Sequence, residues 1–249
     1  EYHTEQVRKD FVANASHELR TPLAIINGYL ENLTEGNLLK DQDTALRFLK
    51  IMGKHGRRIA RIVEDMLLIS RLESSEANTL KIEPFRLQSC ALDVVERLES
   101  VISTQGASVH LQMEVPEVRL AGDRFYWTQI LFNLVENALK QNPQIPLAVI
   151  VGWREEESGL MIWVEDNGIG IPSSDLPFIF RRFYRVEKHH SQEEIKGTGL
   201  GLSIVRRAVE AHEGHIEVGS IPGEATRFEI TLPPQMILPE GSNTPDESA

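Results

Sequence analysis

The residues best suited to chemistry include a histidine block near the start of the chain, Ser16-His-Glu-Leu-Arg-Thr-Pro22. On a helix of about 100° per residue, His17 lies about 180° from the apolar Ile26 and so projects from the polar face. Glu18 can reach an imidazole nitrogen, and a carboxylate that accepts the ring proton leaves the other nitrogen free to attack phosphorus. The block predicts a nucleophilic histidine; the simpler alternative is an exposed helix histidine without a role.

A second block, Asn133-Leu-Val-Glu-Asn137, places two amides four residues apart on one helix face. Their neutral oxygens, with Glu136 beside them, suit Mg²⁺ and its water shell. Lys140 follows one turn after Glu136, where it can meet a phosphate as a point charge. Alone, this pattern also fits polar side chains on any solvated helix face.

Two glycine-rich segments complete the set of candidate binding residues. Asp166-Asn-Gly168-Ile-Gly170 directly follows the apolar run 160–164, so the backbone can bend around a flat ligand while the Asp166 carboxylate accepts from an exocyclic amine such as that of adenine. Gly197-Thr-Gly199-Leu-Gly201 opens a predicted helix, where free N–H groups suit phosphate. The residues assigned to nucleotide binding are Asn133, Asn137, Lys140, Asp166, Gly168, Gly170, Gly197, Thr198, Gly199, Leu200 and Gly201.

The spacing of these glycines excludes two common nucleotide motifs. It is not the Gly-x-Gly-x-x-Gly of dinucleotide folds, and the chain has no Gly-Lys-Ser/Thr P-loop. A different nucleotide fold is therefore indicated. The alternative for the first segment is an ordinary Asn-Gly hairpin turn.

A long connection, residues 173–196, separates the two glycine segments. Its length, its charges and its cluster of aromatic residues predict a mobile lid over the nucleotide. The aromatic residues are Phe178, Phe180, Phe183 and Tyr184. Arg185 is the best candidate in this lid for a phosphate contact in the transition state. His189 and His190 are assigned no role.

The elements that must position the histidine are two amphipathic helices. Apolar residues recur in steps of three and four over 4–32 and again over 45–70. Two helices alone would leave Leu46, Ile62 and Ile69 in water, so we predict that two hairpins pair into a four-helix bundle in a homodimer. The alternative is a hairpin that packs against the second domain of its own chain.

The rest of the chain predicts an α+β fold, in which a mixed sheet carries helices on one face. The expected strands are 80–87, 109–113, 147–153, 160–165, 215–220 and 226–232, and the expected helices are 88–105, 123–140 and 200–212. A short polar hinge over 73–78 separates the domains, and the Pro-rich, acidic end is predicted to be disordered. The predicted domains are 1–74 and 79–234, followed by a tail over 235–249.

Composition limits the classes of partner and compartment. With 26 Lys plus Arg against 37 Asp plus Glu, the net charge of -11 argues against nucleic acid or an anionic membrane as a non-specific partner. The single cysteine, Cys90, cannot form an internal disulfide, which fits a reducing, cytoplasmic compartment. No apolar run approaches the roughly 18 residues of a membrane span. Because the chain begins with Glu1, we expect any membrane anchor to lie upstream.

In this order the blocks resemble those of sensor histidine kinases of two-component systems, over nearly the whole chain. The resemblance implies a dimerisation and histidine-phosphotransfer domain followed by an ATP-binding α/β sandwich of the gyrase and chaperone type. It further implies that His17 accepts phosphate from ATP, that Glu18 acts as base, that Asn137 binds Mg²⁺ and that Asp166 reads adenine. By the same resemblance, Thr21 would orient water when phosphate is removed from a response regulator.

The resemblance also implies partners and a location. The phosphate would pass to an aspartate on a receiver domain, and the chain would be the cytoplasmic part of a bacterial inner-membrane protein, with phosphate-responsive sensors as the subfamily most similar at the start. Gln141 departs from the family, which has an aromatic residue after the lysine of the asparagine block. Two alternatives stay open: a pseudokinase or phosphatase-biased dimer scaffold, and an ATP-gated clamp ATPase.

Overall fold

A computed structural model describes residues 2–35, 41–73, 80–114, 118–142, 146–186 and 197–239. Nearly all of the predicted hinge, the second half of the predicted lid with His189 and His190, and the tail from residue 240 onward lie outside the described residues.

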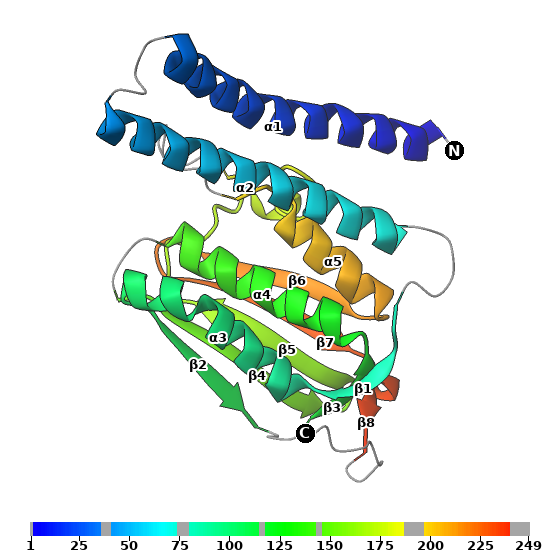
Figure 1. The fold of residues 1–249 in the computed structure, drawn as a ribbon. Coiled ribbons are helices and arrows are strands. Elements are labelled where there is room, and N and C mark those ends of the chain that lie inside the picture. Colours follow the sequence, from blue (N-terminus) through cyan, green and yellow to red (C-terminus); the bar gives the residue numbers. More distant parts are fainter. Residues whose placement is uncertain are drawn as a thin grey trace.

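The N-terminal part is an antiparallel hairpin of two long helices, α1 (Tyr2–Glu35) and α2 (Gln42–Glu73), as predicted (Figure 1). Helix α1 continues through Pro22 without a break in its assignment. The hairpin lies along one side of the second domain, with α2 next to it and α1 on the outside. Among the described residues, no helix combines the length and apolar character needed to cross a membrane.

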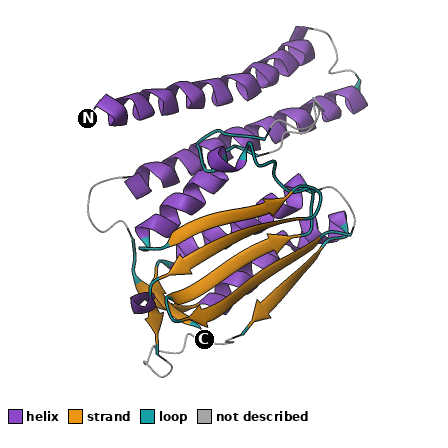
Figure 2. Ribbon diagram, turned by 180° about the vertical axis from the view of Figure 1, so that it is seen from behind, coloured by secondary structure: helices purple, strands orange, loops and turns teal. Residues whose placement is uncertain are grey.

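The second domain is built on a mixed sheet of five strands in the order β2-β4-β5-β7-β6. Strand β2 pairs in parallel with β4, and the other pairs are antiparallel. The strands are β2 (Ser108–Met113), β4 (Ala148–Glu156), β5 (Gly159–Asp166), β6 (His215–Ile221) and β7 (Ala225–Leu232). The helices α3 (Leu87–Gln105), α4 (Arg124–Gln141) and α5 (Gly201–Ala211) lie together on one face, and Figure 2 shows the strands on the other. The predicted mixed sheet with helices on one face is confirmed.

A small antiparallel sheet in the order β1-β3-β8 was not predicted as such. Its strands are β1 (Glu83–Arg86), β3 (Arg119–Gly122) and β8 (Ile237–Leu238). Strands of four and two residues contain too few alternations to give a clear pattern. The predicted disorder from residue 235 is wrong for its first residues, because the 3₁₀ turn η3 (Pro234–Met236) leads into β8, which pairs with the edge of β3.

Helix α4 is the central support of the predicted nucleotide site. Its apolar face is fully buried in the core, which includes Trp127, Ile130, Leu131, Leu134 and Leu139. Asp123 caps its start by accepting hydrogen bonds from the backbone N–H groups of Phe125 at 3.0 Å and Tyr126 at 3.5 Å. A cap of this kind contributes about 1 kcal/mol. The buried face fixes the helix, and the opposite face can therefore present polar residues in a defined geometry.

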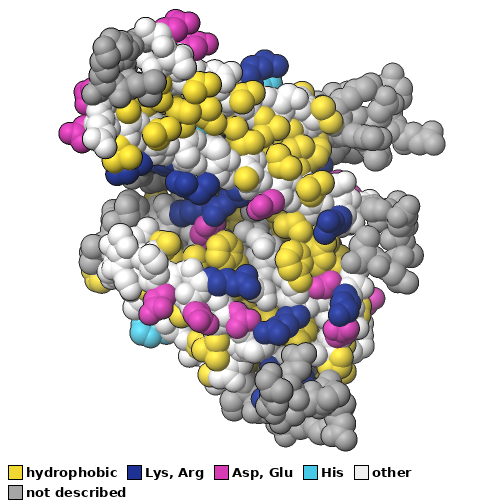
Figure 3. Space-filling model, in the orientation of Figure 1, with side chains coloured by type: hydrophobic (Ala, Val, Ile, Leu, Met, Phe, Trp, Pro, Cys, Tyr) yellow, Lys and Arg dark blue, Asp and Glu magenta, His cyan; other side chains and the backbone are white. Residues whose placement is uncertain are grey.

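The two domains share an apolar contact between α2 and α5. Ile69 is fully buried together with Leu200 and Ile204. Ile62 and Ile69, two of the three residues from which the homodimer was predicted, are 0% exposed within the single chain, while Leu46 is 51% exposed. For Ile69 the reason is that the second domain covers this side of α2. Hydrophobic side chains still gather over the hairpin in the upper part of Figure 3.

Candidate functional site

A cavity of about 1140 Å³ lies between α2, α4, α5 and the end of β5. It brings together segments that are far apart in the sequence. The predicted residues in its wall are Asn133, Asn137, Lys140, Asp166, Gly170, Arg185, Gly197, Thr198, Gly199 and Gly201. The asparagine block, both glycine segments and the described half of the predicted lid thus meet at one site.

Asp166 is the most strongly perturbed acid in this cavity. Its side chain is 6% exposed, and its Oδ1 accepts hydrogen bonds from the Gly168 N–H at 2.9 Å and from Asn142 Nδ2 at 3.0 Å. Burial raises the pKa of Asp166 from 3.8 to about 6, although these two hydrogen bonds oppose the shift. Both bonds go to the same oxygen, so Oδ2 is left to interact with a ligand.

Asn142 is a site residue that the sequence patterns missed. It is buried, its Nδ2 also donates to the Ala138 carbonyl at 2.8 Å, and its Oδ1 accepts from the Ile169 N–H at 2.7 Å. A Cβ on Gly168 would lie 1.9 Å from Asn142 Oδ1, so only glycine allows this approach. Asn142 therefore joins the end of α4 to the carboxylate and to the first glycine segment. Its only signal in the sequence is its place just after the asparagine block.

Replacing Asn142 with alanine should destabilise the domain by about 2–4 kcal/mol, because two or more buried polar groups would lose their partner at about 1–3 kcal/mol each. Urea unfolding followed by circular dichroism measures this free energy. The matched control is Gln141→Ala at the adjacent, exposed position, where we expect a change within about 0.5 kcal/mol. Equal effects of the two substitutions would contradict the positioning role of Asn142.

The α4 side of the cavity carries alternating charges. Lys140 Nζ lies 2.7 Å from Glu136 Oε1, and the same oxygen accepts from Arg61 of α2 at 3.2 Å. Asn137 lines the cavity beside them. Among the described residues, no cluster of three or more His, Cys, Asp or Glu side chains forms a metal site by itself. Mg²⁺ binds oxygen ligands, keeps several waters and takes further ligands from substrate phosphates, so the amide oxygen of Asn137 fits the predicted role.

The second glycine segment has the backbone geometry that only glycine adopts readily. Gly199 has φ +75°, and a Cβ there would lie 2.8 Å from the Phe183 Cα. Thr198 is buried, and its hydroxyl donates to Asp65 Oδ2 of α2 at 2.7 Å. Burial raises the pKa of this Asp65 carboxyl. Leu200 does not line the cavity, because its side chain packs in the apolar contact between the domains.

His17 lies at a second, smaller hollow of about 310 Å³, which we call the histidine cleft. The residues that line it are Asn14, His17, Glu18, Arg181, Arg182, Phe183 and Tyr184. Glu18, the residue after His17, accepts a hydrogen bond at its Oε2 from Arg58 Nη2 of α2 at 2.7 Å, which fixes this carboxylate. The Thr21 hydroxyl donates to the His17 carbonyl at 3.4 Å and is exposed. The sequence singled out Arg185 but missed Arg181 and Arg182, which precede it.

Comparison with known protein families gives two matches along the chain. Residues 7–75 match the His Kinase A phospho-acceptor domain, and residues 122–236 match the ATPase domain described as histidine kinase-, DNA gyrase B- and HSP90-like. The first match contains His17, and the second contains every predicted residue of the large cavity.

Individual relatives are similar over nearly the whole chain. The sensor histidine kinase WalK of Bacillus subtilis is 39% identical over 238 residues, which cover 92% of this chain and 37% of WalK. The phosphate regulon sensor protein PhoR of Pseudomonas aeruginosa is 33% identical over 233 residues, which cover 94% of this chain and 52% of PhoR. The chain thus spans between about a third and a half of the length of these curated relatives.

Solved structures share the fold. The histidine kinase ThkA, in its complex with the response regulator protein TrrA, aligns with a TM-score of 0.70 and 22% identity, over 94% of this chain and 64% of ThkA. At this identity the likeness shows the architecture, a helical hairpin followed by the ATPase domain.

Proposed function

Because the chain belongs to the two-component sensor histidine kinase family, we propose that it transfers the γ-phosphoryl group of ATP to His17 and then to an aspartate of a response regulator. The observation that carries the proposal is the pair of adjoining hollows, one with the predicted nucleophile and one with the predicted nucleotide residues. That ThkA is seen in a complex with a response regulator supports the partner class.

The large cavity would bind ATP through three groups of residues. Asp166 Oδ2 accepts from the exocyclic amine of adenine, and the N–H groups of the second glycine segment hold the phosphates at the start of α5. Lys140 and Arg185 balance the phosphate charge as it shifts in the transition state. Asn137 would hold Mg²⁺, which supplies charge neutralisation on the phosphate oxygens.

At the histidine cleft, one ring nitrogen of His17 attacks the γ-phosphorus in line with the bond that breaks. Glu18 accepts the proton from the other ring nitrogen, and Arg58 keeps that carboxylate in place. The phosphoryl group then passes from His17 to the aspartate of the receiver domain.

A homodimer would complete the helical domain. Seven apolar side chains on the hairpin are 42–56% exposed. Single exposed apolar residues are common on protein surfaces, but a group of this size on one element marks an interaction surface. The seven residues are Val12, Leu23, Leu30, Leu46, Leu49, Val63 and Leu67. A second hairpin on this face makes the predicted four-helix bundle, as the phospho-acceptor domain match supports. We further propose that the chain is the cytoplasmic part of a longer sensor in the bacterial inner membrane.

Incubation with γ-labelled ATP and Mg²⁺ tests the proposed reaction. We expect label on the protein that is lost in acid and stable in alkali, as a phosphoramidate is. Transfer to a receiver domain would then follow on its addition. Nucleotide binding without any label would instead favour the phosphatase-biased scaffold, and ATP hydrolysis without label would favour the clamp ATPase.

For Thr21 we propose that its hydroxyl orients the water that removes phosphate from the regulator. The Thr21→Ala variant should keep autophosphorylation within about twofold and slow dephosphorylation of the phosphorylated regulator at least about tenfold, the scale of one well-placed polar group. The rate of phosphate release measures this. Thr34→Ala is the matched control, because Thr34 is also an exposed threonine of α1 and bonds only helix carbonyls. Unchanged release in Thr21→Ala would refute the role.

A further inference from the structure

The histidine cleft and the large cavity, which is the proposed nucleotide site, have a common wall within one chain. Phe183 and Tyr184 line both hollows, with His17 on one side and Asn137 and Asp166 on the other. The acceptor and the nucleotide site of the same chain are therefore separated at this point by a wall formed by two consecutive residues.

Phe183 in this wall has an unusual backbone conformation. Its φ is +61°, in the left-handed region that costs a non-glycine residue about 1–2 kcal/mol. Its N–H donates to the Gly199 carbonyl at 2.8 Å, and its ring lies 5.9 Å from that of Phe11 on α1. Contacts from the glycine segment and from α1 thus hold the wall on both sides.

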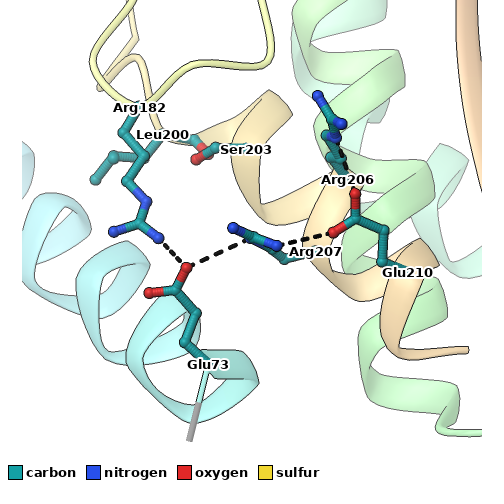
Figure 4. Close-up of polar contacts among 7 residues, drawn as sticks. All are labelled: Glu73, Arg182, Leu200, Ser203, Arg206, Arg207 and Glu210. Atoms are coloured by element: carbon teal, nitrogen blue, oxygen red, sulfur yellow. Dashed lines mark hydrogen bonds and ion pairs between the residues drawn. The ribbon is translucent and has the colours of Figure 1, made fainter. Parts of the chain in front are cut away.

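The hairpin that carries His17 is fastened to the catalytic domain of its own chain. At the end of α2, Glu73 pairs with Arg182 and lies 3.4 Å from Arg207 of α5 (Figure 4). One turn earlier, Ile69 packs against Leu200, which lies near this ion cluster. These contacts place α2 directly beside the site.

A further turn back, Asp65 accepts from Thr198, and the Glu18–Arg58 pair fixes α1 against α2. Asp65 and Ile69 lie four residues apart, so they share one face of α2, which is the face turned toward the catalytic domain. The hairpin of the chain thus delivers its own His17 to its own catalytic domain.

The face proposed for dimerisation points the other way. Val63 and Leu67 are exposed. Each lies two residues from Asp65, which contacts the catalytic domain, and two residues correspond to about 200° around the helix. A partner hairpin bound there would lie on the far side of α2 from the histidine cleft. His17 of the same chain is therefore better placed than the partner's His17 to react with ATP bound in the large cavity of that chain.

We propose that autophosphorylation occurs in cis, so that the ATP held by one chain phosphorylates His17 of the same chain. This inference rests on the function proposed above. The P–N bond forms at His17 as the bond between the γ-phosphorus and the β–γ bridging oxygen breaks, and ADP leaves with that electron pair. The ring proton passes to Glu18. Movement of Phe183 and Tyr184 opens the path between the two hollows.

Mixed dimers test the proposal directly. One chain carries His17→Gln, which removes the acceptor, and the other carries Asp166→Asn, which weakens ATP binding about 100-fold. ATP is kept at a concentration that fills only the unaltered nucleotide site, and two affinity tags isolate the mixed species. In cis, the nucleotide-competent chain has no acceptor and the acceptor chain has no nucleotide, so we expect no label from γ-labelled ATP above that of the His17→Gln homodimer. Label on the Asp166→Asn chain would overturn the proposal.

Two controls separate this inference from the proposed function. The first control is a mixed dimer of the unaltered chain with a chain that carries both substitutions. If the reaction occurs in cis, this dimer should be labelled to about half the level of the unaltered homodimer. If it occurs in trans, the dimer should carry no label, because the altered chain offers neither an acceptor nor a bound nucleotide. The unaltered homodimer must itself be labelled; if it is not, the proposed kinase function fails. If it is labelled and the double-substituted mixed dimer is not, only the cis assignment fails.

Discussion

Replacing His17 with glutamine should abolish phosphorylation of the protein while leaving ATP binding within about twofold. Glutamine keeps a polar side chain of similar reach but has no ring nitrogen that can form the phosphoramidate. Since His17 is exposed, the substitution should change stability by no more than about 0.5 kcal/mol. Labelling with γ-labelled ATP, together with nucleotide titration of the same sample, measures both properties.

The chain offers a matched control in His110, an exposed histidine on strand β2 of the catalytic domain. His110→Gln should be labelled as fully as the unaltered protein. Acid-labile label that persists in His17→Gln would show that another residue accepts the phosphoryl group, and the assignment of the histidine cleft would then be wrong.

Replacing Asp166 with asparagine should weaken ATP binding about 100-fold and at the same time stabilise the fold. A hydrogen bond to a charged acceptor contributes about 1.5–3 kcal/mol, and the amide can turn its NH₂ toward the adenine amine, so that two donors face each other. Inosine triphosphate has a carbonyl in place of that amine. The variant should therefore lose its preference for ATP over inosine triphosphate, which competition binding measures.

The gain in stability follows from the perturbed acid. Its pKa of about 6 in the folded protein exceeds 3.8, so the unaltered domain loses stability as pH rises through 6, by roughly 3 kcal/mol in all. Asparagine has no such cost, and we expect the variant to be about 1–3 kcal/mol more stable at pH 8, with a difference that shrinks as pH falls below 6. Urea unfolding at several pH values measures this. A variant that is less stable at pH 8 would contradict the burial of an ionised carboxylate.

ATP binding by the unaltered protein should follow the same titration. The adenine amine needs the ionised carboxylate, so affinity should fall as pH drops through about 6, by up to tenfold per unit below it. In Asp166→Asn this part of the pH dependence should disappear, while the titration of the ATP phosphates affects both proteins alike.

Much of the fold was predictable because its signals are local. The apolar steps of α1 and α2, the apolar run of β5, the alternation in β7 and the glycines at the start of α5 depend on neighbouring residues and on helix or strand geometry. The same holds for most site residues, since ten of the predicted residues line one cavity. Residue type and order along the chain therefore determined the family and the candidate chemistry.

Contacts between residues far apart in the sequence could be seen only in the tertiary structure, because local patterns carry no information about them. Asn142 is polar and follows a helix, and only the approach of the first glycine segment makes it the partner of Asp166. The Asp65–Thr198 hydrogen bond joins residues 133 positions apart, and the burial of Ile69 depends on the similarly distant Leu200 and Ile204. The raised pKa of Asp166 and the common wall of the two hollows have the same origin. Desolvation and adjacency depend on which elements pack together, and packing is a property of the whole chain.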